Sequence, residues 1–258
     1  IDNSPGAAAV AAVPGANDTP NGRLVFNSET TQIGSNAFNV VGYSDLDIAA
    51  RGSLLLKDSG SLKTVGNLTV NSSRITTGAG ASQTLEAAGA LAVNTTTGTP
   101  SVVSGLGGNL ALKGARVDMN GGIYLPSGII TLQATGSAPG SDVNVGGTLD
   151  ASGTVVSYAD QIRYTSGGRI ILQSDNGSIN LGSSSLVNVG AQAGGGDAGS
   201  LTASATKGTF TAAGTLVGQA SANGTGGQFI LDVGSQPTLA ALNATLNALS
   251  GIFLLTGY

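Results

Sequence analysis

The 258-residue sequence contains no cysteine, histidine or tryptophan, and only 9% of its residues are charged. Without cysteine it forms neither a disulfide framework nor a thiolate metal site, and without histidine it lacks the commonest general base and transition-metal ligand. Its ten lysines and arginines are scattered and its formal net charge is −4, so no basic stripe is present to neutralise nucleic-acid phosphates. We therefore expect no metal, no cofactor and no nucleic-acid partner.

Aromatic residues are also scarce, at 4%, whereas hydrophobic residues make up 40% and glycine accounts for 42 positions. A core of leucine, valine, isoleucine and alanine favours a thin, layered architecture. No apolar run approaches the roughly 18 residues that cross a bilayer, and no charged-then-apolar leader precedes Ile1. We expect a soluble chain without a transmembrane segment, excised from a longer protein.

The sequence does contain a repeated five-residue phrase, in which glycine is followed by large apolar residues at the second and fourth positions. The phrase occurs eleven times, against roughly three occurrences expected from composition. Pairs such as Leu110 and Leu112 share one face of a strand, because side chains alternate with a period of two. The residues between them are often small or polar, which indicates half-buried strands and disfavours a doubly wound α/β fold. The phrases begin at Gly22, Gly52, Gly66, Gly89, Gly108, Gly121, Gly128, Gly168, Gly177, Gly227 and Gly251.

The spacing of the phrases predicts a solenoid. With Gly147 included, whose second apolar residue is alanine, successive starts at Gly89, Gly108, Gly128, Gly147 and Gly168 are about twenty positions apart. Glycine, asparagine, serine and aspartate between the strands supply tight or left-handed corners. Three longer intervals, from Gly22 to Gly52, Gly168 to Gly199 and Gly199 to Gly227, indicate either coils with loop insertions or one and a half coils. We predict an all-β fold, a right-handed parallel β-helix with coils of about twenty residues.

The two ends differ from the shaft, which we place at residues 22–235. Residues 1–21 contain three prolines and no strand alternation, as is typical of a low-complexity linker or excursion. Leucines after Pro237 recur at helical spacing, which predicts a short amphipathic helix within 236–250 that packs over the side or end of the solenoid. Residues 251–258 are expected to begin a further β segment. The leucines of the helix are Leu239, Leu242, Leu246 and Leu249.

Four segments resemble the filamentous haemagglutinin family of large secreted exoproteins: LPSGIITLQATG (125–136), VGGTLDASG (145–153), YADQIRYTSGGRIILQSDNGSINL (158–181) and AGGGDAGSLTASATKGTF (193–210). The resemblance covers residues 105–235 well and 22–104 more loosely. It implies a right-handed β-helical shaft, export by an outer-membrane partner transporter, and adhesion, biofilm formation or contact-dependent competition at the bacterial cell surface. The Asn-Pro-Asn-Gly-like signatures of the family's secretion domain are not visible, so the resemblance is to the shaft.

Catalysis is the first alternative to weigh, because several β-helical polysaccharide lyases and hydrolases use clustered acids with a basic residue. Asp142, Asp150 and Asp160 are near one another in sequence, but capping of solvent-exposed turns accounts for aspartates at such corners. We assign no catalytic residue and expect no enzyme.

Two further segments invite a binding interpretation. Residues 158–164 (YADQIRY) combine aromatic and ionic side chains, as a sugar-stacking platform does. We favour instead a loop that packs Tyr158, Ile162 and Tyr164 against the shaft while Asp160 pairs with Arg163. The segment GAQAGGGDAG (190–199) lacks the lysine and hydroxyl of a phosphate loop, and a single Asp197 makes a poor calcium site. We expect a tight or flexible corner there.

Asparagines recur near the predicted corners, where amide ladders between stacked coils would satisfy their side chains. From these observations we expect an extracellular adhesive shaft with many weak contacts to a glycan, matrix or cell-surface receptor. A self-assembling filament or biofilm-matrix subunit, joined through unpaired terminal strands, is the alternative, and a polysaccharide-active enzyme is the least favoured. The asparagines are Asn67, Asn71, Asn94, Asn109, Asn144, Asn176 and Asn180.

Overall fold

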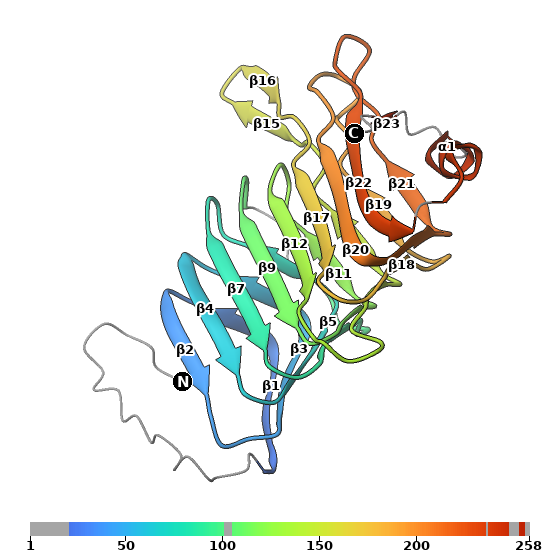
Figure 1. The fold of residues 1–258 in the computed structure, drawn as a ribbon. Coiled ribbons are helices and arrows are strands. Elements are labelled where there is room, and N and C mark those ends of the chain that lie inside the picture. Colours follow the sequence, from blue (N-terminus) through green and yellow to red (C-terminus); the bar gives the residue numbers. More distant parts are fainter. Residues whose placement is uncertain (1–20, 101–104, 236, 248–252, 256–258) are drawn as a thin grey trace.

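The computed structural model describes residues 21–100, 105–235, 237–247 and 253–255. All but two of the described strands belong to one parallel sheet, which coils around a long axis (Figure 1). The remaining pair, β15 and β16, is antiparallel. The prediction of an all-β parallel β-helix is thus confirmed. The expected linker, residues 1–21, lies outside the described residues except for Asn21.

Each coil passes through up to three faces, which we number in the order in which the chain meets them. Face 1 stacks the first halves of β1 (Arg23–Ile33) and β3 (Asp45–Leu56), then β5 (Asn67–Ser72), β8 (Leu91–Asn94), β10 (Val117–Met119), β13 (Val143–Val145), β18 (Ile179–Leu181) and the end of β20 (Ser200–Ala212). Face 2 stacks the second halves of β1 and β3, then β6 (Ile75–Thr77), β11 (Gly122–Tyr124), β14 (Thr148–Asp150), β19 (Leu186–Asn188) and β21 (Thr215–Val217).

Face 3 is the longest and most regular of the three. It stacks β2 (Asn36–Val40), β4 (Ser59–Thr64), β7 (Ser82–Ala87), β9 (Asn109–Gly114), β12 (Ile129–Ala134), β17 (Arg169–Ser174), the start of β20, β22 (Gly227–Ser235) and β23 (Phe253–Leu255). Its strands are the row of arrows at the front of Figure 1.

Coil length varies more than the phrase spacing predicts. Leu110 pairs with Ile130, and Ile130 pairs with Ile170, so the second of these coils is twice as long as the first. The phrase at Gly147 does not begin a coil, because it leads into β14 on face 2. The two intervals that flank Gly147 therefore belong to one long coil. A period of about twenty fits the early coils, in which Leu46 pairs with Leu68, and the step from β9 to β12, but not the last coils, in which Ile170 pairs with Leu201. The phrase marks the start of a strand, whichever of the three faces that strand belongs to.

Inward-facing residues stack in register from coil to coil. One row on face 3 is buried throughout, and each such side chain contributes roughly 1.5–3 kcal/mol to folding relative to exposure. Similar rows from faces 1 and 2 join it in a single aliphatic cluster that extends from Val40 to Leu246. The row consists of Leu110, Ile130, Ile170, Leu201 and Phe229.

The glycines of the phrase allow neighbouring coils to approach closely. A Cβ atom on Gly168 would lie 1.9 Å from the backbone oxygen of Gly128, and one on Gly199 would lie 1.8 Å from that of Gly168. No side chain fits at these distances, so the stacked corners require glycine. This contact is the physical reason for the repeat.

Helix α1 (Leu239–Asn247) lies at the C-terminal end of the shaft (Figure 1). Leu242 and Leu246 are buried in the core cluster, which confirms the predicted amphipathic helix within 236–250. The helix stands between β22 and β23, where earlier coils carry strands of faces 1 and 2. It therefore covers the end of the core, while β23 continues face 3 as the further β segment expected within 251–258. Leu249 lies outside the described residues.

Candidate ligand-binding edge

The corner between face 2 and face 3 is where the coils differ most. In the early coils it is tight, with Asp58 and Gly80 in left-handed conformations (φ 57° and 61°) just before a face 3 strand. Gly107 and Ser127 adopt the same conformation further along, which confirms the predicted left-handed corners. Three later coils carry insertions at this corner. We call these insertions, residues 151–168, 189–199 and 218–226, the loop edge.

The first insertion contains a β-hairpin, formed by β15 (Val155–Tyr158) and β16 (Gln161–Tyr164), that projects from the shaft (Figure 1). The expectation that its side chains pack on the shaft is wrong for most of them: Tyr158 is 64% exposed and Ile162 60%. Arg163 donates to Gln161 (3.0 Å), and none of the described ion pairs joins it to Asp160. The hairpin lies outside the coil, because the core inside the coil is already filled.

Tyr164 is the side chain that does pack. Cβ atoms placed on Gly194 and Gly195 would lie 2.4 Å and 2.9 Å from its ring, so the ring rests across these two glycines of the second insertion. The predicted corner at 190–199 thus has a specific purpose, because glycine is the residue that leaves space for the ring. Gln192 ties the same loop to the hairpin by donating to the backbone oxygen of Gly153 (2.6 Å).

Hydroxyl groups hold the base of the hairpin in place. The Thr165 backbone N–H donates to the Thr154 oxygen (2.9 Å), and the Thr165 hydroxyl accepts from the Thr154 N–H (2.8 Å). The Ser127 hydroxyl donates to the Thr165 hydroxyl (2.6 Å) from the preceding coil. The base is therefore fixed, although the strands above it are exposed.

The second and third insertions are joined around Asp197. Its carboxylate accepts from the Thr225 N–H (2.7 Å), and the oxygen of Gly196 accepts from the Ser221 hydroxyl (2.9 Å). Between the two loops lies a hollow of about 320 Å³, lined by residues 193–197 and 221–224. Asp197 thus has a structural role, because its carboxylate holds the third insertion to the second.

The aspartates considered for catalysis occupy separate places. Asp150 accepts from the Ser152 N–H two residues further on (2.9 Å), which confirms turn capping there, whereas Asp142 accepts from the Ser178 N–H of the next coil (2.7 Å) and so links two coils. Asp160 stands in the hairpin turn. Within the described ranges, no three carboxylates are gathered where they would hold one metal ion.

Polar ladders form on the outer surface of face 1, as the asparagines predict in part. Asn180 donates to Asn144 (2.9 Å), which donates to Asp118 (2.8 Å), and the Thr211 hydroxyl extends the ladder to Asn180 (3.0 Å). The remaining predicted positions give a mixed result. Asn94 donates to Asn71, Asn67 to Asp45 and Asn176 to the Gly136 oxygen, whereas Asn109 has Ser82 and Ile129 as its register neighbours.

Gln83 has the longest uncharged side chain among the buried polar residues that sequence reasoning missed. Gln83 faces inward on β7, 2% exposed, in register with Leu110. Its amide nitrogen donates to the backbone oxygens of Gly34 (2.9 Å) and Lys57 (2.7 Å), and its amide oxygen has no hydrogen-bond partner among the described residues. The signal was present, because Gln83 stands two residues before the inward-facing Leu85. It binds together corners of the first coils.

Comparison of the chain with protein-family models, with curated proteins and with solved structures finds no match. In the part of the chain that the structure describes, no helix has the length and apolar character needed to cross a membrane. The functional interpretation therefore depends on the geometry above and on the sequence segments that resemble a family of exoproteins.

Proposed function

We propose that the protein is an extracellular adhesive shaft of a bacterial surface protein, in which a rigid β-helix presents the loop edge to a surface. The observation that supports this proposal most strongly is the contrast between the continuous buried core and the exposed hairpin beside it. Rigid elements that hold projecting loops are a common arrangement in binding proteins. Many copies of such a shaft on one cell would make strong attachment from individually weak contacts.

Secretion by a partner transporter belongs to the same proposal and is supported by the four sequence segments given above. Adhesion requires no chemical reaction. The structural roles of Asp142 and Asp150 are consistent with this, because both carboxylates are engaged with backbone N–H groups.

Adhesion can be tested with beads coated with the chain and applied to surfaces on which the producing cells grow. The control replaces residues 155–164 with Asn-Gly, which closes the Thr154–Thr165 pair with a two-residue hairpin turn. We expect coated beads to adhere and the control beads to adhere less. Immunodetection on intact cells tests the location. Beads that adhere no better than uncoated ones, or a protein found only inside cells, would contradict the proposal.

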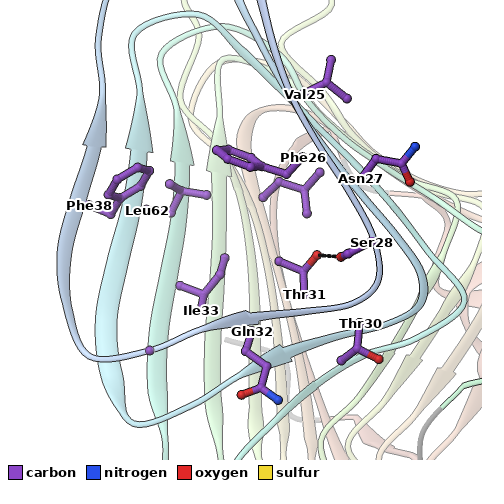
Figure 2. A pocket seen from close by; sticks show the side chains of 12 residues that line it. Val25, Phe26, Asn27, Ser28, Thr30, Thr31, Gln32, Ile33, Phe38 and Leu62 are labelled. Atoms are coloured by element: carbon purple, nitrogen blue, oxygen red, sulfur yellow. Dashed lines mark hydrogen bonds between the residues drawn. The ribbon is translucent and has the colours of Figure 1, made fainter. Parts of the chain in front are cut away.

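A second function, that of a self-assembling filament subunit, is favoured by the N-terminal end of the shaft. The first coil leaves a hollow of about 450 Å³ that opens onto the core, and Figure 2 shows Phe26, Ile33, Phe38 and Leu62 around it. In the described chain, β1 pairs with β3 and β2 with β4, and neither has a strand on its other side. Open edges of this kind template pairing with another chain.

Association through this hollow and these edges would join two N-terminal ends. Sedimentation of the chain over a range of concentrations tests this. Association that Phe38→Asp abolishes would support self-assembly, and a monomer at every concentration would exclude it.

A further inference from the structure

Exposed apolar side chains are concentrated on the hairpin. The described residues include nine large hydrophobic side chains that are exposed, and four of these lie between Val155 and Tyr164. Clusters of this kind on a soluble protein mark interaction sites. The coil that carries the hairpin, from Ile130 to Ile170, is also the longest described, so the exposed cluster coincides with the largest departure from the regular coil.

The two faces of the hairpin differ in chemistry. Residues opposite each other in an antiparallel pair share a face, so Val155, Tyr164 and Ile162 lie on one side. Tyr158 and Arg163 lie on the other side. Tyr164 rests on Gly194 and Gly195, and the same two glycines line the hollow between the second and third insertions, so they connect the Tyr164 side of the hairpin to the hollow.

The hollow itself is polar and nearly uncharged. Ser221 and Asn223 border it, and among the described residues Asp197 is the only ionisable one in its lining. Hydrogen bonds from Thr225 to the Asp197 carboxylate and from Ser221 to the Gly196 oxygen fix its shape. An apolar aromatic step thus adjoins a preformed polar depression whose described lining contains no cationic side chain.

We propose that the Tyr164 side of the hairpin and the adjoining hollow form a binding site for a neutral glycan. A sugar ring has an apolar face that stacks on an aromatic ring, and hydroxyl groups at its edge that bind amide, hydroxyl and backbone groups. The hollow is of the size that small ligands occupy. An anionic polysaccharide is disfavoured, because the carboxylate of Asp197 would repel it. A folded protein partner typically needs about 20 to 30 residues on each side, more than this face and hollow supply.

This site deepens the proposed adhesive function and rests on it for its biological meaning, but its chemistry is testable alone. Tyr158 provides a matched control, because it is a tyrosine of the same hairpin on the opposite side. The test measures binding of the full chain to neutral and to acidic or sulfated oligosaccharides by titration calorimetry, at ligand concentrations up to about 10 mM.

We expect a neutral oligosaccharide to bind, Tyr164→Ala to weaken that binding about tenfold, and Tyr164→Phe to retain it. Tyr158→Ala should change binding by less than about twofold. Asn223→Ala, which leaves the hairpin intact, should also weaken binding, so the result does not depend on how Tyr164→Ala folds. Thermal unfolding of each variant checks the shaft.

The proposal is overturned if no neutral oligosaccharide binds, if only acidic ones bind, or if Tyr158→Ala is as harmful as Tyr164→Ala. Its failure is distinguishable from that of the adhesive function. If the beads adhere and neutral oligosaccharides do not compete, the proposed glycan site is wrong and the adhesive function stands. If oligosaccharides bind and the beads do not adhere, the glycan site stands and the adhesive function is wrong.

Discussion

The first three coils, from β1 to β7, and the last three, from β13 to β22, share one core but differ in their corners and outer surfaces. In the first coils the corner before face 3 is short, and ion pairs join neighbouring coils: Arg23–Asp47, Arg51–Glu29 and Lys63–Glu86. In the last coils the same corner carries the loop edge, and the ladder there joins the neutral side chains of Asn144, Asn180 and Thr211, although it begins one coil earlier at Asp118, which pairs with Arg116.

This difference shows that separate residues determine the packing of the core and the length of the corner before face 3. Face 3 keeps its register across the longest coil, because Ile130 and Ile170 pair as closely as Leu110 and Ile130 do in the coil of half that length. From β9 to β22, each face 3 strand has a glycine at its entry and an apolar residue two positions later, whereas β7 has Ala81 and Gln83 at the matching positions. Stability should therefore be sensitive at those positions and tolerant at the loop edge.

The largest effect is expected from a methyl group added between coils. Gly168→Ala places Cβ 1.9 Å from the Gly128 oxygen, so we expect a loss of about 3 kcal/mol in the free energy of unfolding. Gly34→Ala, in the first coil, is the control, because a Cβ there meets no atom within 4 Å. It should change stability by less than about 1 kcal/mol. Urea unfolding compares them, and equal losses would refute the close-approach explanation.

Gln83 gives the next largest effect and tests the first coils alone. Gln83→Leu leaves the Gly34 and Lys57 oxygens without their amide donor, which we expect to cost about 1–2 kcal/mol by urea unfolding. Gln173→Leu is the matched change in the last coils, where the half-buried side chain donates to Asp175. We expect it to cost less than about 0.5 kcal/mol. A larger loss of stability for Gln173→Leu than for Gln83→Leu would contradict this prediction.

The outer surfaces should differ in their response to salt. Asn144→Ala removes two half-buried ladder hydrogen bonds and should cost about 1 kcal/mol, with a weaker dependence on ionic strength than an exposed ion pair shows. Lys63→Ala removes an exposed ion pair and should cost about 0.5 kcal/mol or less, an effect that about 0.5 M salt removes. Unfolding at low and high salt measures both. A loss at Asn144 that falls with salt as steeply as the loss at Lys63 would count against the ladder.

The smallest expected effect is on acid stability. Hydrogen bonds from Asn67 and Ser44 lower the pKa of Asp45 below its ordinary value, with Arg23 adding to the effect. Its contribution is therefore present above the unfolded pKa, near 3.9, and is lost as pH falls through the lower folded value. Asp45→Asn should lose less stability than the parent between about pH 5 and pH 2. An NMR titration showing an ordinary pKa for Asp45 would contradict this.

The sequence allowed the strands to be predicted well and the coils less well, for a physical reason. Alternation of apolar residues after Gly108 and Gly128 reflects burial that each strand needs by itself. Coil boundaries depend on which strands pair, and Gly147 shows that the same entry phrase serves face 2. The hairpin residues were misassigned because whether Tyr158 is buried depends on the space the coils leave. The contact of Tyr164 with Gly194 joins two separate insertions, and no local pattern reveals it.

The orientation of the backbone hydrogen bonds has a mechanical consequence. Those between coils, such as Arg169 N–H to the Gly128 oxygen (2.8 Å) and Gln228 N–H to the Gly199 oxygen (3.0 Å), link each coil to the next along the axis. Tension applied between the two ends pulls these bonds open one layer at a time. Each layer that detaches releases its whole coil, roughly 70–140 Å of chain when extended. A cell tethered through such a rod would be held by a line that lengthens under load before it breaks.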